Sequence, residues 1–255
     1  MAALSEYANK YACMKMERRD GVLQVTLHSD GGSLKWGLGP HKELPLAFYD
    51  IANDHETKVV ILTGTGEEFS GPRVTNVGHP LFPTRPSMEL IDALVSEGKQ
   101  GLMNFLNIDV PVISAINGPA WRHSELPLLA DIVLAADTAA FQDSAHFTGG
   151  LVPGDGMHVV YPLLLGVNRA RYFLLTGETL DAQKAHQLGL VAEVLPRDKL
   201  MARAWALAED MARRPKSLLR LSRAVLTEHI KRHMQDYLGF GLYVEMLALM
   251  DRPGA

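Results

Sequence analysis

Three short, continuous apolar runs constrain the fold of this chain more than any other feature. They occupy residues 58–63, 111–116 and 131–137. Runs of this kind are typical of strands buried on both faces, as in a parallel sheet. Helical patterns separate or precede them, at about residues 41–53 and 88–106. Strand and helix in alternation predict an α/β fold with crossover connections.

The remaining elements surround this predicted sheet. Asp20-Gly21 lies between two strand-like runs and predicts a hairpin, because this dipeptide suits a tight turn. Short strands are expected at 139–142 and 190–195. The further predicted helices lie at residues 125–130, 157–165, 168–175, 181–188, 197–213, 216–229 and 231–250. We therefore expect an α/β core over residues 1–195, followed by a helical region over 196–255.

Composition excludes several classes of protein. A net charge of −4, with no basic stripe among aromatic residues, disfavours nucleic acid as a partner. The single cysteine, Cys13, rules out an internal disulfide and a cysteine-based zinc site. No apolar stretch is long enough to span a bilayer, so no membrane partner is expected. The first residues lack the pattern of a secretory signal, so we expect a cytoplasmic protein.

Residues 141–157 combine a histidine and a carboxylate across a tight turn. His146 and Asp155 flank a glycine- and proline-rich stretch, and a predicted helix follows Asp155. This arrangement can bring an imidazole against a carboxylate, the pairing that orients a general base. Asp155 can equally be a helix cap, and taken alone the cap is the better interpretation. Other polar groups must converge on the pair before a catalytic role is favoured.

Four ordered stretches of the chain together resemble the crotonase (enoyl-CoA hydratase/isomerase) superfamily. They are residues 59–70, residues 111–120 with 125–135, residues 141–156, and residues 174–195. The resemblance implies a repeated ββα superhelix with a C-terminal helical trimerisation region, and a homotrimer or a hexamer formed as a dimer of trimers. Members usually bind an acyl-CoA thioester and stabilise an enolate oxygen with two backbone N–H groups.

The sequence departs from the usual hydratase pattern at the positions that matter most. The residues 121–124, Trp-Arg-His-Ser, replace a run of glycines. His146 stands where hydratases carry a second catalytic glutamate, and Asp155 replaces a small residue. In the first stretch Pro72 has no N–H to donate, although Arg73 keeps its own.

These departures resemble the β-diketone hydrolases of the superfamily, typified by 6-oxocamphor hydrolase. The resemblance implies catalytic roles for His146, Asp155, His123 and Glu245, and a substrate-binding role for Trp36. It implies retro-Claisen hydrolysis of a small cyclic 1,3-diketone to a keto acid, with the His-Asp pair activating water and with neither cofactor nor metal. Glu245 lies on a mostly apolar helix, where a carboxylate tends to have a raised pKa.

Other interpretations stay open at this point. Glu125 matches a glutamate that is catalytic in hydratases, so an enoyl-CoA hydratase or isomerase is the alternative function. A non-catalytic oligomeric binding protein is a third hypothesis. Taken singly, Trp36 can be a core aromatic, His123 a surface residue near a helix start, and Glu245 an exposed or ion-paired position.

Overall fold

A six-stranded, mainly parallel sheet forms the centre of the molecule in the computed structural model, which describes residues 3–74 and 85–251. In spatial order its strands are β1 (Met14–Arg19), β2 (Val22–Leu27), β3 (Val59–Gly64), β4 (Val112–Ile116), β5 (Ile132–Ala136) and β8 (Glu193–Leu195). β1 and β2 pair antiparallel, and every other neighbouring pair is parallel. A second, two-stranded sheet joins β6 (Ala140–Phe141) to β7 (Leu180–Asp181).

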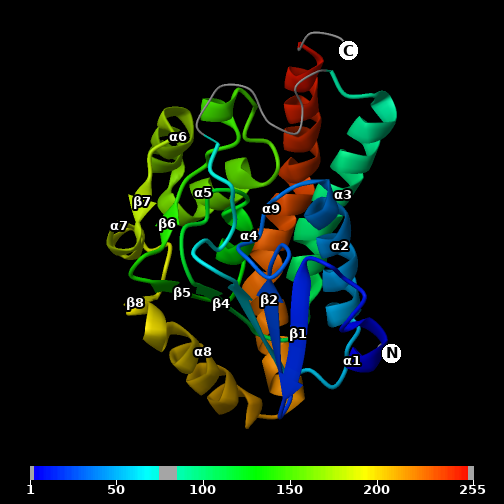
Figure 1. Ribbon diagram of the computed structural model, residues 1–255, viewed down its shortest axis with the longest axis vertical. Helices are drawn as coiled ribbons and strands as arrows, with labels where there is room; N and C mark the ends of the chain where they lie inside the picture. Colours follow the sequence, from blue (N-terminus) through cyan, green and yellow to red (C-terminus); the bar gives the residue numbers. More distant parts are fainter. Residues whose placement is uncertain (1–2, 75–84, 252–255) are drawn as a thin grey trace.

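Helices cover both faces of the main sheet (Figure 1). They are α1 (Leu4–Tyr7), α2 (Leu38–Ala52), α3 (Met88–Asn107), α4 (Glu125–Leu128), α5 (Met157–Leu165), α6 (Val167–Thr176), α7 (Ala182–Gln187), α8 (Arg197–Ala212) and α9 (Lys216–Met250). α8 packs against one face of the sheet, and α2, α3 and α9 contribute to the core on the other.

Residues of β3 show why its apolar run is continuous. Val59 and Ile61 belong to the core cluster on the α8 side, whereas Val60 and Leu62 belong to the larger cluster on the opposite face. Side chains alternate between faces along a strand, so a strand buried on both sides needs apolar residues at every position. This confirms the α/β architecture predicted from the three apolar runs.

Single bridge residues complete the repeated ββα pattern. Ser70, Ala120 and Phe141 follow β3, β4 and β5 respectively, and they pair in parallel with one another. Each unit therefore consists of a long strand, a very short one, and a helix. The fold class expected from the resemblance is confirmed.

The N-terminal hairpin also forms as predicted. Asp20 and Gly21 both have positive φ, 51° and 81°, between the paired strands β1 and β2. Two successive residues in this region are typical of the tight turn that suits the twist of a hairpin.

The two last predicted helices are in fact one. α9 runs for 35 residues and extends along much of the molecule (Figure 1). The prediction of a break near residue 230 was wrong, because neither proline nor glycine interrupts the chain there. Near the start of α9, Arg223 is buried and pairs through Nε with Asp131 Oδ2 at 2.7 Å. Its Nη1 donates to the carbonyl of Leu106 at 2.9 Å.

The later part of α9 contributes to the same core as the sheet. Met234, Leu238, Leu242 and Leu249 are buried in the large core cluster. The division of the chain at residue 195 stays a prediction. No helix in residues 3–74 and 85–251 is long and apolar enough to cross a membrane.

Segments that follow the strands and bridge residues supply the polar residues of interest. Trp36 comes after β2, His123 after β4, and His146 after β6. Ligand sites in open α/β sheets commonly lie at the carboxyl ends of the strands. The topology therefore brings these three side chains to the same end of the sheet.

Candidate active site

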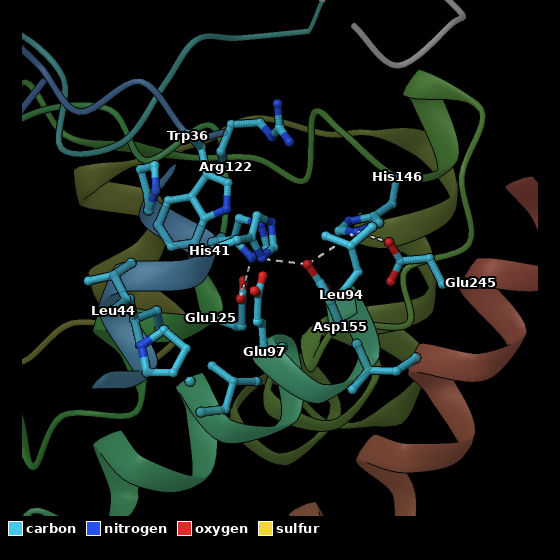
Figure 2. A pocket seen from close by; sticks show the side chains of 18 of the residues that line it. Trp36, His41, Leu44, Leu94, Glu97, Arg122, Glu125, His146, Asp155 and Glu245 are labelled. Atoms are coloured by element: carbon cyan, nitrogen blue, oxygen red, sulfur yellow. Dashed lines mark hydrogen bonds and ion pairs between the residues drawn. The ribbon is translucent and has the colours of Figure 1, made fainter. Parts of the chain in front are cut away.

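A pocket lies at this end of the sheet, between α2, α3 and α9. It encloses about 750 Å³ of atom-free space, including the part that opens to solvent. One wall is apolar and is formed by side chains such as Leu44, Phe48, Leu94, Leu102, Leu242 and Met246. The polar wall contains all five residues predicted from the sequence, namely Trp36, His123, His146, Asp155 and Glu245. In Figure 2, Asp155 lies in the middle, with His146 and Glu245 on one side and Trp36 and Glu125 on the other.

Trp36 is fixed by its backbone and by stacking. Its backbone N–H donates to the carbonyl of Gly71 at 2.7 Å. Its ring stacks on that of His123, with centroids 4.0 Å apart and an interplanar angle of 29°. The indole Nε1 is buried and has no hydrogen-bond partner within the described residues. A buried, unpaired donor costs roughly 1–3 kcal/mol, so a ligand oxygen would relieve that cost.

His123 has an unusual backbone conformation, and two carboxylates contact its ring. Its φ is 50°, in the left-handed region that a non-glycine residue rarely occupies. Its Nδ1 lies 3.0 Å from Glu125 Oε1 and 3.0 Å from Asp155 Oδ2. Burial alone would lower the pKa of His123, but the charges of Glu125 and Asp155 outweigh it and raise the pKa to about 9. His123 is therefore a donor at neutral pH.

His146 lies among three carboxylates. Its Nδ1 is 2.6 Å from Asp143 Oδ1, and its Nε2 is 3.3 Å from Asp155 Oδ2 and 3.6 Å from Glu245 Oε1. Burial opposes the charged ring, but the charges of Asp143 and Asp155 dominate and raise the pKa of His146 well above its ordinary value. The imidazolium is consequently the main form of His146 at neutral pH.

Asp155 connects the two histidines and does not cap a helix. Its Oδ2 is the atom that approaches both rings. α5 begins at Met157 with Gly156 as its cap residue, and no side chain caps it. The interpretation of Asp155 as a cap was therefore wrong. Burial favours the neutral acid, but His146 and His123 outweigh it and hold the pKa of Asp155 well below its usual range.

Two glutamates complete the polar wall. Burial raises the pKa of Glu125 to about 7, and burial also raises the pKa of Glu245. This confirms the raised pKa expected for Glu245 on an apolar helix. One oxygen of each carboxyl, Oε2, is buried without a hydrogen-bond partner among residues 3–74 and 85–251. Burial therefore favours the protonated form of both carboxyls more than water would.

A pair of glycines sets how closely the Asp155 segment approaches α9. A Cβ built on Gly154 would lie 2.1 Å from the carbonyl oxygen of Gly241 and 2.8 Å from Glu245 Cβ. A Cβ on Gly241 would lie 2.1 Å from His158 Cε1 and 2.4 Å from the oxygen of Gly154. The absence of side chains at both positions lets Asp155 and Glu245 face the same imidazole.

Two backbone N–H groups in the segments that resemble the hydratase pattern are engaged within the protein. The N–H of Val74 donates to Ser144 Oγ at 3.1 Å, and the N–H of Trp121 donates to the carbonyl of Ser70 at 2.9 Å. Pro72 has no N–H, whereas Arg73 keeps its own.

Two sets of side chains have the composition of a metal site. They are His123, Glu125 and Asp155, and His146, Asp155 and Glu245, with ligand atoms within 4.8 Å of one another in each set. His158 takes no part, because its Nε2 lies 3.1 Å from the carbonyl oxygen of Tyr237. Within each set the carboxylates already neutralise the imidazoles. The expectation that the protein uses no metal and no cofactor stays a prediction.

Sequence reasoning missed one close partner. Asp143 is buried and makes the shortest contact to His146, yet the prediction paired His146 with Asp155 alone. The signal was present, since Asp143 precedes His146 by three residues in an irregular segment, where an Asx side chain often turns back on the chain. The glycine contact with α9 had no signal in the sequence.

Comparisons with known proteins agree with this geometry. Residues 17–247 match the family model described as enoyl-CoA hydratase/isomerase. A probable enoyl-CoA hydratase from Mycobacterium tuberculosis is 30% identical over 247 residues, which cover 90% of this chain and 83% of that protein. A solved β-diketone hydrolase from the cyanobacterium Anabaena sp., bound to (S)-3-oxocyclohexyl acetic acid, is 43% identical with a TM-score of 0.91, and the match covers 96% of this chain and 97% of that one. A solved enoyl-CoA hydratase/isomerase from Mycobacterium paratuberculosis is 26% identical with a TM-score of 0.83, covering 94% of each chain. The chain belongs to the enoyl-CoA hydratase/isomerase family, the crotonase superfamily.

Proposed function

We propose that this enzyme hydrolyses a carbon–carbon bond of a cyclic 1,3-diketone and releases a keto acid. The observation that carries the proposal is the convergence of Trp36, His123, His146, Asp155 and Glu245 on one pocket. Residues from four separate parts of the chain meet there, at hydrogen-bond distances or in ring contact.

Water activation is assigned to His146. Its neutral form takes a proton from water at Nε2, the nitrogen that faces Asp155 and Glu245. The resulting hydroxide adds to one carbonyl carbon of the substrate. Asp155 stabilises the imidazolium that forms, because its carboxylate lies 3.3 Å from the same nitrogen. The raised pKa of His146 means that the base form becomes more abundant as the pH rises.

Carbonyl binding is assigned to Trp36 and His123. The unpaired indole N–H is a donor only, and the protonated imidazole beside it is a donor as well. Together they stabilise negative charge on oxygen, either in the tetrahedral adduct or in the enolate that leaves when the carbon–carbon bond breaks. The enolate carbon is then protonated, so that water has been added across the broken bond.

The apolar wall favours a ring-shaped, uncharged substrate. Apolar side chains of α2, α3 and α9, including Phe48, Leu94 and Leu242, form this wall, although His41 and Arg122 also line the pocket. The ligand of the Anabaena hydrolase is a ring ketone with an acetic acid arm. Opening one ring of a bicyclic 1,3-diketone leaves a keto acid of this type. We therefore propose a bicyclic diketone as the substrate class.

An enoyl-CoA hydratase or isomerase is the second candidate. Glu125 supports it, because this carboxyl is fully buried in the pocket with a pKa of about 7. Hydratases, however, use a second glutamate where this chain has His146, and bulky side chains at residues 121–124 replace their run of glycines. Glu125 instead contacts His123, which gives it a role in either reaction.

A continuous assay separates the two candidates. Loss of diketone absorbance is followed with a bicyclic 1,3-diketone, without added CoA or metal, for wild type, Asp155→Asn and the exposed control Asp137→Asn. We expect turnover by wild type and control, and a loss of about 10²- to 10⁴-fold in Asp155→Asn. If the folded wild-type protein cleaves no cyclic diketone but hydrates an enoyl thioester, the proposal is wrong and the second candidate takes its place. Inactivity in both assays would favour the non-catalytic binding protein.

A further inference from the structure

Asp143 makes the closest polar contact to the proposed base. Its Oδ1 lies 2.6 Å from His146 Nδ1, whereas the nearest oxygen of Asp155 lies 3.3 Å from Nε2. The same Oδ1 accepts the backbone N–H of His146 at 3.3 Å. Asp143 is 2% exposed, and its other oxygen has no hydrogen-bond partner in the described part of the chain. The carboxylate is thus committed to His146.

Distances to the carboxylates indicate which nitrogen carries the proton. An ionised carboxylate only accepts hydrogen bonds, and Asp143 lies closer to Nδ1 than Asp155 or Glu245 lies to Nε2, so the single proton of the neutral ring is assigned to Nδ1. A neutral His146 then has its lone pair on Nε2, the nitrogen that faces the pocket. In that form Asp155 cannot accept a hydrogen bond from Nε2. It can do so only after Nε2 has taken a proton.

We propose that Asp143 is the positioning residue that holds His146 in the Nδ1–H tautomer, and that Asp155 acts after the proton transfer by stabilising the imidazolium. This inference rests on the proposed role of His146 as base, and it divides between Asp143 and Asp155 the roles that the sequence analysis assigned to Asp155 alone. Asp143 does not touch substrate. It aims the lone pair of Nε2 at the position where water would be activated.

The segment around Asp143 is anchored on both sides, which a positioning role requires. Ser144 donates through Oγ to the carbonyl of Trp121 at 2.7 Å. Gln142 donates through Nε2 to the carbonyl of Gly177 at 2.7 Å. The N–H of Leu151 donates to the carbonyl of His146 at 2.9 Å. These bonds hold the backbone that carries both the carboxylate and the imidazole.

Several other charged groups face this pair and contribute to its titration. Asp155 approaches from the segment before α5 and Glu245 approaches from α9. His123 shares Asp155 with His146. Burial lowers the pKa of Arg122, and the charges of Asp155 and Asp143 act in the opposite direction, so this guanidinium also lies within their field. Removing only the Asp143 charge therefore lowers the pKa of His146 without leaving the ring isolated.

The test compares two isosteric variants by ¹⁵N NMR of histidine-labelled protein, with the His146 signals identified from His146→Gln. At alkaline pH, where the ring is neutral, wild type should carry its proton on Nδ1. Asp155→Asn should keep this tautomer, because Asp143 remains. Asp143→Asn should lose it, because an amide can donate to Nδ1 and leave the proton on Nε2. The contrast between the two variants is the signature of positioning.

Kinetics give a second readout on the same variants. Asp143→Asn should lower kcat by about 10²- to 10⁴-fold with little change in KM, as expected when the wrong tautomer is held. The pH limb of kcat/KM should move to lower pH, because one of the charges that raises the pKa of His146 is gone.

Two results would overturn the inference. One is a wild-type neutral ring with its proton on Nε2, or a ring still doubly protonated at about pH 10. The other is an Asp143→Asn protein that keeps the Nδ1–H tautomer and the wild-type pH limb. If Asp143→Asn fails to fold, the wild-type and Asp155→Asn spectra still decide the tautomer. If wild type cleaves no diketone but shows the Nδ1–H tautomer, the positioning holds and only the proposed reaction is lost.

Discussion

Replacing Gly241 by alanine tests how the site depends on the close approach between the Asp155 segment and α9. The added Cβ would lie 2.1 Å from His158 Cε1 and 2.4 Å from the carbonyl oxygen of Gly154, where ordinary contact begins at 3.4 Å. The Asp155 segment must move away by about 1 Å, and His158 must also shift, which disturbs its contact with the carbonyl of Tyr237. Gly239 lies on the same helix and is the matched control. A Cβ there would meet no described atom within 4 Å outside the backbone of its own helix.

The two variants share one energetic gain and differ in one cost. Alanine stabilises a helix by about 1 kcal/mol relative to glycine at either position. Overpacking costs about 1–3 kcal/mol and applies only to Gly241→Ala. The difference between the variants therefore isolates the steric cost. For a chain of this size about 1 kcal/mol corresponds to roughly 2–4 °C, so the melting temperatures should differ by about 2 to 12 °C.

Activity should respond more strongly than stability. A displacement of about 1 Å between catalytic groups can lower the rate about 100-fold. Thermal unfolding by circular dichroism and kcat/KM on the diketone are measured for wild type, Gly239→Ala and Gly241→Ala. We expect Gly239→Ala to be at least as stable as wild type and equally active. Equal melting temperatures and equal kcat/KM for the two variants would refute the reasoning.

Four further outcomes are expected. Trp36→Phe should lower kcat/KM about 10²- to 10³-fold by removing one donor. It should not lower the melting temperature, because Nε1 has no partner in the described part of the protein. A large loss of stability with normal kcat would contradict this. In a pH profile kcat/KM should rise with pH through a limb above 6.5, because the pKa of His146 is raised and the base must be unprotonated; a limb at or below 6.5 would contradict the assignment. Arg223→Leu should lower the free energy of unfolding by about 1–3 kcal/mol in urea titrations, because it takes a donor from the buried carbonyl of Leu106 and removes the ion pair with Asp131; a loss under about 1 kcal/mol would show that these contacts add little. We also propose that the protein is a homotrimer or a hexamer, since apolar side chains of α9 such as Phe240, 71% exposed, are left uncovered; light scattering should give a multiple of three chains, and a monomer would overturn the proposal.

The sheet could be predicted from the sequence because its signals are local. β3, β4 and β5 are continuous apolar runs, and Asp20-Gly21 marks a tight hairpin. Each signal depends on a few neighbouring residues. Burial on two faces requires apolar residues along a strand, and a tight turn requires residues that accept positive φ. The break predicted inside α9 was wrong, because neither glycine nor proline lies near residue 230 to end the helix there.

The residues of the polar wall could be named from the sequence, but the contacts between them could not. Trp36, His123, His146, Asp155 and Glu245 were chosen through a family resemblance, and the structure brings them together. Which nitrogen of which histidine meets which carboxylate depends on ring orientation, and that is set by long-range packing.

Two missed contacts differ in how far the sequence could specify them. Asp143 had a local signal, because it precedes His146 by three residues in an irregular segment. The glycine contact with α9 had none. Gly154 and Gly241 are 87 positions apart, and nothing in either segment indicates that their backbones touch. Contacts of this kind are made by the fold and have no local signature.

The position of α9 in the chain has a consequence for biosynthesis. Glu245 is made 90 residues after Asp155, and the α9 side chains Leu242 and Met246 cover the same pocket. At roughly 5–20 residues per second, about 5 to 18 s pass on the ribosome between these two parts of the site. During that interval the apolar face of α3, with Leu94 and Leu102, has no α9 to cover it. The nascent chain therefore carries exposed apolar surface of the kind that favours aggregation until the residues of α9 have been made.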